Sequence, residues 1–258
     1  MKEKYDVKAI KEHYKNMAEK WKTEGKSTME DMNTRRLEIE AVLKYLKDGQ
    51  KVLETGCGNG YATVRILENK KIDLTSMDFS EHLIEQAKKQ DLGKIIGKAK
   101  FELGDVLKLK YKDNSFDNAF SIRCLINITD WEYQKKALDE ICRVLKKGGH
   151  YIMCESFIDG WSNMNEARKE LGLKEITQPF HNLYFDKEKV AGHLNRKMQL
   201  INEDNFLSSY YFGARVMYPA LLGKNKEPRF DSKINTFFAA MPAYGNHGTI
   251  KILVLKKL

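Results

Sequence analysis

Apolar side chains recur every three or four residues in two stretches near the start of the chain, residues 6–22 and 33–46. This period is typical of a helix with one buried face, so it predicts two helices. Asp48-Gly49 follows the second stretch, and glycine is common just after a helix ends. Residues 1–48 are therefore predicted to form a helical cap on the domain that follows.

The pattern changes after residue 49, where short apolar strands alternate with amphipathic helices. We expect strands at 51–54, 72–78, 100–105, 116–123 and 150–155. Helices are expected between them at 61–68, 80–90 and 131–144, and Lys146-Lys147-Gly148-Gly149 is typical of a turn. Repeated strand–helix units predict an α/β fold, doubly wound, with a mostly parallel sheet and helices on both faces.

The last third of the chain departs from this alternation. A helix at 186–194, a strand at 200–207 and a final strand at 250–255 are expected. Residues 208–248 hold many aromatic and turn-forming residues and are too long for an ordinary loop. We therefore predict one domain at 49–258 with 208–248 as an inserted substrate lid. A purely structural or dimer-forming role for this segment is an equal alternative.

Composition is typical of a globular intracellular protein. The chain has 258 residues, of which 42% are hydrophobic and 31% charged, enough to bury the core of one large domain. No apolar run approaches the ~20 residues that cross a bilayer, and the charged N-terminus lacks the apolar segment of a signal peptide. Four scattered cysteines, Cys57, Cys124, Cys142 and Cys154, lack metal-ligand spacing. These features predict a cytoplasmic protein with no metal site and no membrane contact.

The net charge of +9 narrows the type of partner only in part. Lys and Arg number 45 against 36 acidic residues, but they are spread along the chain in ones and twos. Nucleic acid is therefore the less favoured partner, and a small substrate that carries phosphate or carboxylate also fits the charge.

A glycine-rich turn, Glu54-Thr55-Gly56-Cys57-Gly58-Asn59-Gly60, joins the strand at 51–54 to the helix at 61–68. Glycines let the backbone approach a ligand closely, and the helix start adds free N–H groups. Nicotinamide cofactors favour the spacing G-x-G-x-x-G, whereas this turn has G-x-G-x-G after Glu54. The turn therefore favours a ligand with positive charge near Glu54 over a pyrophosphate.

Two acidic residues stand at the ends of the next two strands. Asp78, about 20 residues after the turn, is placed to accept hydrogen bonds from both hydroxyls of a ribose. Asp105 can accept from an adenine amino group while Val106 packs on the ring. Together with Glu54, these positions predict S-adenosylmethionine, which combines a cationic amino-acid end, a ribose and an adenine.

Five segments between residues 51 and 156 together resemble the class I S-adenosylmethionine-dependent methyltransferases of the small-molecule type. They are VLETGCGNG (52–60), SMDFSEHLIEQAKK (76–89), FELGDVLKL (101–109), FDNAFSIRCLINI (116–128) and EICRVLKKGGHYIMCES (140–156). The resemblance implies a seven-stranded sheet whose last strand runs antiparallel beside the sixth. It also implies methyl transfer, with S-adenosylhomocysteine as the product.

The resemblance extends to the residues that bind the cofactor. It implies that the backbone at Arg123 flanks the methionine part, and that a tyrosine and a basic residue of the helical cap cover it. Tyr14 and either Arg35 or Arg36 stand where that role falls, and a core tyrosine with two surface arginines is the equal alternative. The full predicted set is Tyr14, Arg35, Arg36, Glu54, Gly56, Gly58, Asn59, Gly60, Asp78, Phe79, Gly104, Asp105, Val106 and Arg123.

The acceptor is expected to bind to segments after the fifth strand. His181 and His247 are candidates for the base that removes its proton, and His181 is preferred because aromatic residues flank it. The predicted substrate residues are Trp161, Asn182, Tyr184, Tyr210, Tyr211 and Arg215. Sugars, sugar phosphates, nucleotides and natural products all fit as acceptors, through oxygen or nitrogen.

Other functions stay open at this point. Enzymes that methylate base amino groups carry Asn/Asp-Pro-Pro-Tyr/Phe after the fourth strand, where this chain has Arg123-Cys124-Leu125-Ile126. An RNA 2′-hydroxyl or a protein as acceptor has no such marker and stays open, as does a non-catalytic cofactor-binding subunit. A nicotinamide-dependent oxidoreductase is less favoured because of the loop spacing. Both a monomer and a homodimer are compatible with the sequence.

Overall fold

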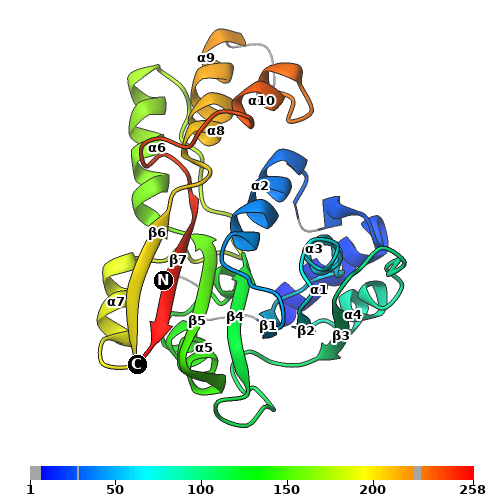
Figure 1. Cartoon of the computed structure of the whole chain (residues 1–258). Coiled ribbons are helices and arrows are strands. Elements are labelled where there is room, and N and C mark those ends of the chain that lie inside the picture. Colours follow the sequence, from blue (N-terminus) through cyan, green and yellow to red (C-terminus); the bar gives the residue numbers. More distant parts are fainter. Residues whose placement is uncertain (1–6, 28, 223–227) are drawn as a thin grey trace.

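Seven strands form one sheet in the order β3-β2-β1-β4-β5-β7-β6 within the residues that the structure describes, 7–27, 29–222 and 228–258 (Figure 1). The structure is a computed structural model. The strands are β1 (Lys51–Thr55), β2 (Asp73–Asp78), β3 (Lys98–Leu103), β4 (Phe116–Ile122), β5 (Leu145–Ser156), β6 (Met198–Asp204) and β7 (Ile250–Lys257). β1 to β5 pair in parallel, and β7 runs antiparallel to both β5 and β6. The predicted mostly parallel sheet with an antiparallel last strand is confirmed.

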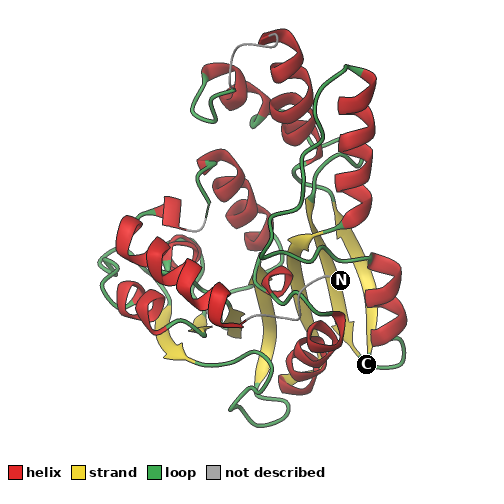
Figure 2. Ribbon diagram, turned by 180° about the vertical axis from the view of Figure 1, so that it is seen from behind, coloured by secondary structure: helices red, strands yellow, loops and turns green. Residues whose placement is uncertain are grey.

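Helices cover both faces of this sheet, as predicted. They include α1 (Val7–Trp21), α2 (Met32–Leu43), α3 (Tyr61–Leu67), α4 (Glu81–Ala87), α5 (Trp131–Val144), α6 (Ile158–Glu170) and α7 (Lys187–Leu194), with short 3-10 turns η1 (Gly25–Ser27) and η2 (Leu125–Asn127). Neighbouring residues along β1 point into two different apolar cores. Val52 belongs to the core that α2 and α3 cover, and Leu53 belongs to the core that α5 and α7 cover. Figure 2 shows α5 lying over the sheet. Within the described residues, no helix is long and apolar enough to cross a membrane.

Side-chain caps fix where several helices begin. Asp31, Ser80, Asp130 and Asp186 each accept a hydrogen bond from a backbone N–H in the helix that follows. Because Ser80 caps α4 only two residues after β2 ends, the cap also fixes the backbone around Asp78 at the edge of the sheet.

Two local predictions are wrong, and one helix is not predicted at all. Residues 146–149 belong to β5, which shifts its register against β4 between Phe116 and Asn118 instead of starting after a turn. The sequence pattern does not predict α6, because only Gly160, Met164 and Asn165 are buried in it and the apolar period is weak. β6 ends at Asp204 rather than at residue 207.

The segment 208–248 joins β6 to β7 and is mostly helical. It contains α8 (Ser208–Phe212), a π-helical turn η3 (Gly213–Met217), α9 (Tyr218–Leu222) and α10 (Lys233–Phe238), while 223–227 lie outside the described residues. These helices stand beside α6 at the top of Figure 1. The segment also reaches α2, because Arg215 pairs with Asp31 at 2.9 Å and Asn33 donates to the carbonyl of Phe230 at 3.2 Å. Its role as a substrate lid stays a prediction.

Candidate functional site

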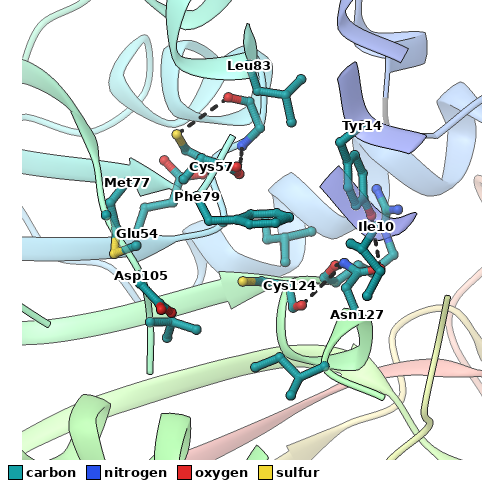
Figure 3. Close-up of a pocket in the computed structure, with 18 of the residues that line it drawn as sticks. Ile10, Tyr14, Glu54, Cys57, Met77, Phe79, Leu83, Asp105, Cys124 and Asn127 are labelled. Atoms are coloured by element: carbon teal, nitrogen blue, oxygen red, sulfur yellow. Dashed lines mark hydrogen bonds between the residues drawn. The ribbon is translucent and has the colours of Figure 1, made fainter. Parts of the chain in front are cut away.

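A cavity of about 430 Å³ opens at the carboxyl ends of β1, β2 and β4 (Figure 3). α1 and α2 contribute to one side, and the loops after β1, β2, β3 and β4 form the rest. Its volume is in the range of small-molecule sites. Because parallel strands end at the same edge of a sheet, residues that follow different strands meet here.

The glycine turn after β1 lines part of this cavity. Gly56 and Gly58 have φ values of +74° and +56°, in the left-handed region that favours glycine. A Cβ atom added to Gly56 would overlap Sγ of Cys124 and lie 2.5 Å from its Cβ. The turn therefore packs directly against the segment that follows β4, and a larger residue would have to displace that segment.

Asp78 ends β2 beside this turn. Its Oδ2 accepts from the N–H of Gly58 and its Oδ1 from the N–H of Ser80, both at 2.9 Å. Burial raises the pKa of this carboxyl to about 6, although the backbone N–H groups oppose the rise. At pH 7 and above the group is mainly an anion, and its oxygens keep lone pairs for further donors.

Glu54 lines the cavity but is also tied into the core. Its Oε2 accepts from the hydroxyl of Thr63 at 2.5 Å and from that of Ser76 at 2.7 Å. Burial raises the pKa of Glu54 despite these donors. The side chain thus anchors the strand end below the glycine turn, and its second oxygen, Oε1, is the one that can face a ligand.

Two arginines approach Glu38 at the α2 side of the cavity. Arg123 donates from Nε to Glu38 at 2.6 Å, and although burial lowers the pKa of Arg123, this carboxylate raises it overall. Arg35 lies 3.9 Å from Glu38, and its buried Nε has no hydrogen-bond partner among the described residues. Burial, and then the charge of Arg123, lower the pKa of Arg35 to about 10. Arg35 is therefore a buried cation that can still bind an anionic ligand group.

Tyr14 of α1 contacts the segment after β4 from the other side (Figure 3). Its hydroxyl donates to Oδ1 of Asn127 at 3.0 Å, and Asn127 donates to the carbonyl of Arg123 at 2.9 Å. Arg123 has a φ of +51°, which is unusual for a residue with a side chain and turns the backbone out of β4. The sequence does not indicate Asn127, because its partner Tyr14 lies 113 positions away.

Apolar side chains line the part of the cavity next to β2 and β3. Leu83, Leu103 and Val106 contribute to it, and Phe79 lies nearby (Figure 3). Asp105 is exposed at the rim, and its Oδ1 accepts from the N–H of Leu107 at 2.8 Å. An apolar slot with a carboxylate at its edge suits a flat ring that carries an amino group.

Three predicted cofactor residues lie outside the cavity lining. Arg36 points away on α2 and binds Glu40 at 2.8 Å. Asn59 donates to two backbone carbonyls just after α1, which ties the helical cap to the glycine turn. Gly60 begins α3 with a φ of +78°. The remaining members of the predicted set line the cavity.

Four predicted substrate residues contact one another in pairs. Trp161 meets the ring of Tyr184 edge to face at 6.3 Å, and Arg215 lies over the ring of Tyr211 at 4.5 Å. Burial, and then Tyr211, raise the pKa of Tyr184 to about 12, while Arg215 and Arg123 oppose the rise. The four residues are thus close enough to interact with one another, and Tyr184 and Tyr211 also interact with Arg123 in the cavity wall.

The two other predicted substrate residues differ in burial, Tyr210 being buried and Asn182 partly exposed. Tyr210 is 2% exposed and donates from its hydroxyl to Asp31 at 2.8 Å. Oδ1 of Asn182 is buried, without a hydrogen-bond partner among the described residues.

The two candidate bases lie in different parts of the fold. His181 stacks on His13 of α1 with 4.6 Å between ring centroids and lies 6.5 Å from the ring of Tyr14. Burial, and then His13, lower the pKa of His181 to about 4, so its ring is neutral at pH 7. His247 instead packs on Phe212 in a groove of the insertion. His181 is thus the candidate that contacts the cavity lining, through Tyr14.

Sequence comparisons identify relatives over part of the chain. The profile of a family described as a methyltransferase domain matches residues 46–205. The chain is 32% identical over 112 residues to the O-methyltransferase rstn1 of Aspergillus nomiae, covering 43% of this chain and 48% of that protein. It is 29% identical over 163 residues to the sterol 24-C-methyltransferase erg6 of Aspergillus fumigatus, covering 62% and 42% respectively. The chain thus spans less than half the length of these relatives.

Solved structures share the fold over almost the whole chain. A chain of the complex between the Haloferax volcanii Trm112 methyltransferase activator and a methyltransferase superposes with a TM-score of 0.64. The match covers 95% of this chain and 96% of that chain, at 16% identity. At this identity, the likeness shows the fold alone.

Proposed function

This chain belongs to the methyltransferase domain family, and from that premise we propose that it transfers the methyl group of S-adenosylmethionine to an oxygen or nitrogen atom of a small polar acceptor. The family and the fold imply S-adenosylmethionine as the cofactor. The observation that carries the proposal is the meeting in one cavity of the glycine turn, Asp78 and Arg35, whose buried Nε has no hydrogen-bond partner among the described residues.

The residues of the cavity fit each part of this cofactor. Gly56 and Gly58 both line the cavity, so the backbone of the turn is accessible to a ligand. Asp78 would accept hydrogen bonds from the ribose hydroxyls, Asp105 would accept from the adenine amino group, and Arg35 would bind the carboxylate of the amino-acid end. When bound, the cofactor supplies a methyl group on a sulfonium, which is already electrophilic.

The acceptor would bind where the wall at Arg123 meets Tyr184, Tyr211 and Trp161. Both arginines near this place are paired, Arg123 with Glu38 and Arg215 with Asp31, so the aromatic rings rather than a free cation would provide most of its contacts. Flat molecules with polar substituents suit such a surface. The O-methyltransferase among the relatives favours a hydroxyl oxygen as the methylated atom.

Binding of S-adenosylhomocysteine is the direct test of the proposed cofactor. We expect isothermal titration calorimetry to show one site per chain for S-adenosylhomocysteine and no heat of binding for NAD. NAD is the appropriate control because its pyrophosphate also binds to glycine turns of this kind. A chain that binds NAD and not S-adenosylhomocysteine would contradict the proposal.

Replacing His181 with alanine tests whether a base assists the transfer. General bases contribute about 10²-fold or more, so the rate of S-adenosylhomocysteine formation with a hydroxylated aromatic acceptor should fall by about 100-fold. Since the pKa of His181 is about 4, the wild-type rate should not change between pH 6 and 8 through this group. His247→Ala, the other candidate, is the matched control and should keep the wild-type rate. An unchanged rate in His181→Ala would remove His181 as the base.

A further inference from the structure

Glu155, in β5, is a fully buried carboxylate with four hydrogen-bond donors. Its Oε1 accepts from the hydroxyl of Ser121 at 2.6 Å and from the N–H groups of Cys124 and Leu125 at 3.1 and 3.0 Å. Its Oε2 accepts from the N–H of Ile126 at 3.3 Å. Three consecutive amides of the segment that leaves β4 thus point at one buried anion.

That segment, residues 123–128, forms one wall of the cofactor cavity. Arg123, Cys124 and Asn127 all line the cavity. Cys124 fills the space next to Gly56, and Asn127 holds the hydroxyl of Tyr14. The conformation of this one segment therefore sets the position of both the glycine turn and the helical cap.

We propose that Glu155 is a positioning residue for cofactor binding, because its ionised carboxylate holds residues 123–128 in the conformation that closes the cavity. The inference rests on the proposed cofactor, since the affinity that it predicts is for S-adenosylhomocysteine. Glu155 acts from behind the wall and is not a member of the cavity lining.

Only the ionised form of Glu155 can accept hydrogen bonds from all four donors around it. An ionised carboxylate accepts about four hydrogen bonds, which matches the four donors. A protonated carboxyl, or the amide of glutamine, presents a donor of its own toward one of the N–H groups. At least one amide of the segment then loses its partner, and a buried N–H without a partner is unfavourable.

The surroundings of Glu155 allow it to change protonation near neutral pH. Burial raises its pKa to about 7, although Ser121 and the three amides oppose the rise. The ammonium of Lys251, opposite Glu155 on β7, is bound by Asp159 and Glu203 and does not pair with it. Among the described residues, four titratable groups face Glu155 from the elements around it: Tyr151, Cys124, Cys154 and Lys251. Of these, Tyr151 binds Ser121 at 2.7 Å. Because the ionised form holds the segment, affinity should fall as the pH decreases through about 7.

Calorimetry on Glu155→Gln is the first test. At pH 8 we expect its affinity for S-adenosylhomocysteine to be about 10-fold weaker than that of the wild type, which corresponds to the loss of one buried hydrogen bond to a charged group. The wild type should lose affinity in two phases between pH 8 and 5, through Glu155 and then through Asp78, whose pKa is about 6. In Glu155→Gln only the second phase should remain. Tyr151→Phe removes the hydroxyl that binds Ser121 and leaves all four donors to Glu155 in place, so it is the matched control and should behave as wild type.

Hydrogen exchange of the ligand-free protein provides a readout that does not depend on the cofactor. Amides 124–126 should exchange at least about 10-fold faster in Glu155→Gln than in wild type or Tyr151→Phe at pH 8, relative to their intrinsic rates. Equal protection and equal affinity in Glu155→Gln would overturn the inference. If Glu155→Gln does not fold, the same amides are compared in the wild type at pH 6 and pH 8. We expect lower protection factors at pH 6, and equal protection factors at the two pH values would overturn the inference. A wild type that binds no S-adenosylhomocysteine would instead contradict the proposed function.

Discussion

Replacing Asp78 with asparagine is expected to weaken the binding of S-adenosylhomocysteine by about 100-fold. The carboxylate already accepts from Gly58 and Ser80, so the two ribose hydroxyls would add two hydrogen bonds to a charged acceptor. Such bonds contribute about 1.5–3 kcal/mol each, and every 1.4 kcal/mol is a factor of ten. Asparagine also turns an N–H₂ group toward one of the two backbone N–H donors, which disturbs the turn itself.

Two comparisons separate this effect from a general loss of structure. Asp73→Asn makes the same change at the exposed start of β2 and should bind like the wild type. A ligand that lacks one ribose hydroxyl should bind less tightly to the wild type, while Asp78→Asn should discriminate much less between the two ligands. If Asp78→Asn discriminates as strongly as the wild type, the carboxylate does not contact the ribose.

Part of the pH dependence of wild-type binding follows from the same carboxylate. Burial raises the pKa of Asp78 to about 6. The ionised form is the proposed acceptor for both ribose hydroxyls. Affinity should therefore decrease as the pH falls through about 6, in addition to the decrease through about 7 that we attribute to Glu155. In Asp78→Asn only the decrease through about 7 should remain, and persistence of the decrease through about 6 would assign it to another group.

Gly56→Ala is expected to abolish measurable cofactor binding and to lower the free energy of unfolding by about 3 kcal/mol. A φ of +74° disfavours any residue with a Cβ by about 1–2 kcal/mol. The new Cβ would also overlap Cys124, and overpacking of this kind typically destabilises by about 1–3 kcal/mol. Relief of the overlap would push Cys124 and Asn127 out of the cavity wall.

Gly148→Ala is the matched control for backbone strain. Gly148 has a φ of +78° and no atom within 4 Å of an added Cβ, so alanine there should lower stability by about 1 kcal/mol and leave binding intact. Adding Cys124→Gly to Gly56→Ala should recover part of the stability, since the overlapping atoms are gone. Equal stability losses in Gly56→Ala and Gly148→Ala would show that the overlap with Cys124 is not responsible. The stabilities are measured by chemical denaturation at pH 8.

The sequence alone determined the alternation of strands and helices up to residue 144 and the acidic and glycine residues that follow those strands. Apolar periods of two and 3.6 residues are local, so the strands and helices up to residue 144 are found close to their predicted positions. The glycine turn, Asp78 and Asp105 each follow a strand, and parallel strands of one sheet end at the same edge. Strand ends that are separate in the sequence therefore converge without any further information.

Only the tertiary structure decided which side chains from other elements line or support the cofactor cavity. Arg35 and Arg36 are neighbours in one helix, and their roles differ because the packing of α2 buries one and exposes the other. His13 meets His181, and Tyr14 meets Asn127, across more than 100 positions of the chain. The hydrogen bonds from residues 124–126 to Glu155 can form only when β4 and β5 are paired. Such contacts depend on how whole helices and strands pack against one another. Apolar packing fixes their relative positions, and it leaves no local sequence pattern at the residues that make these contacts.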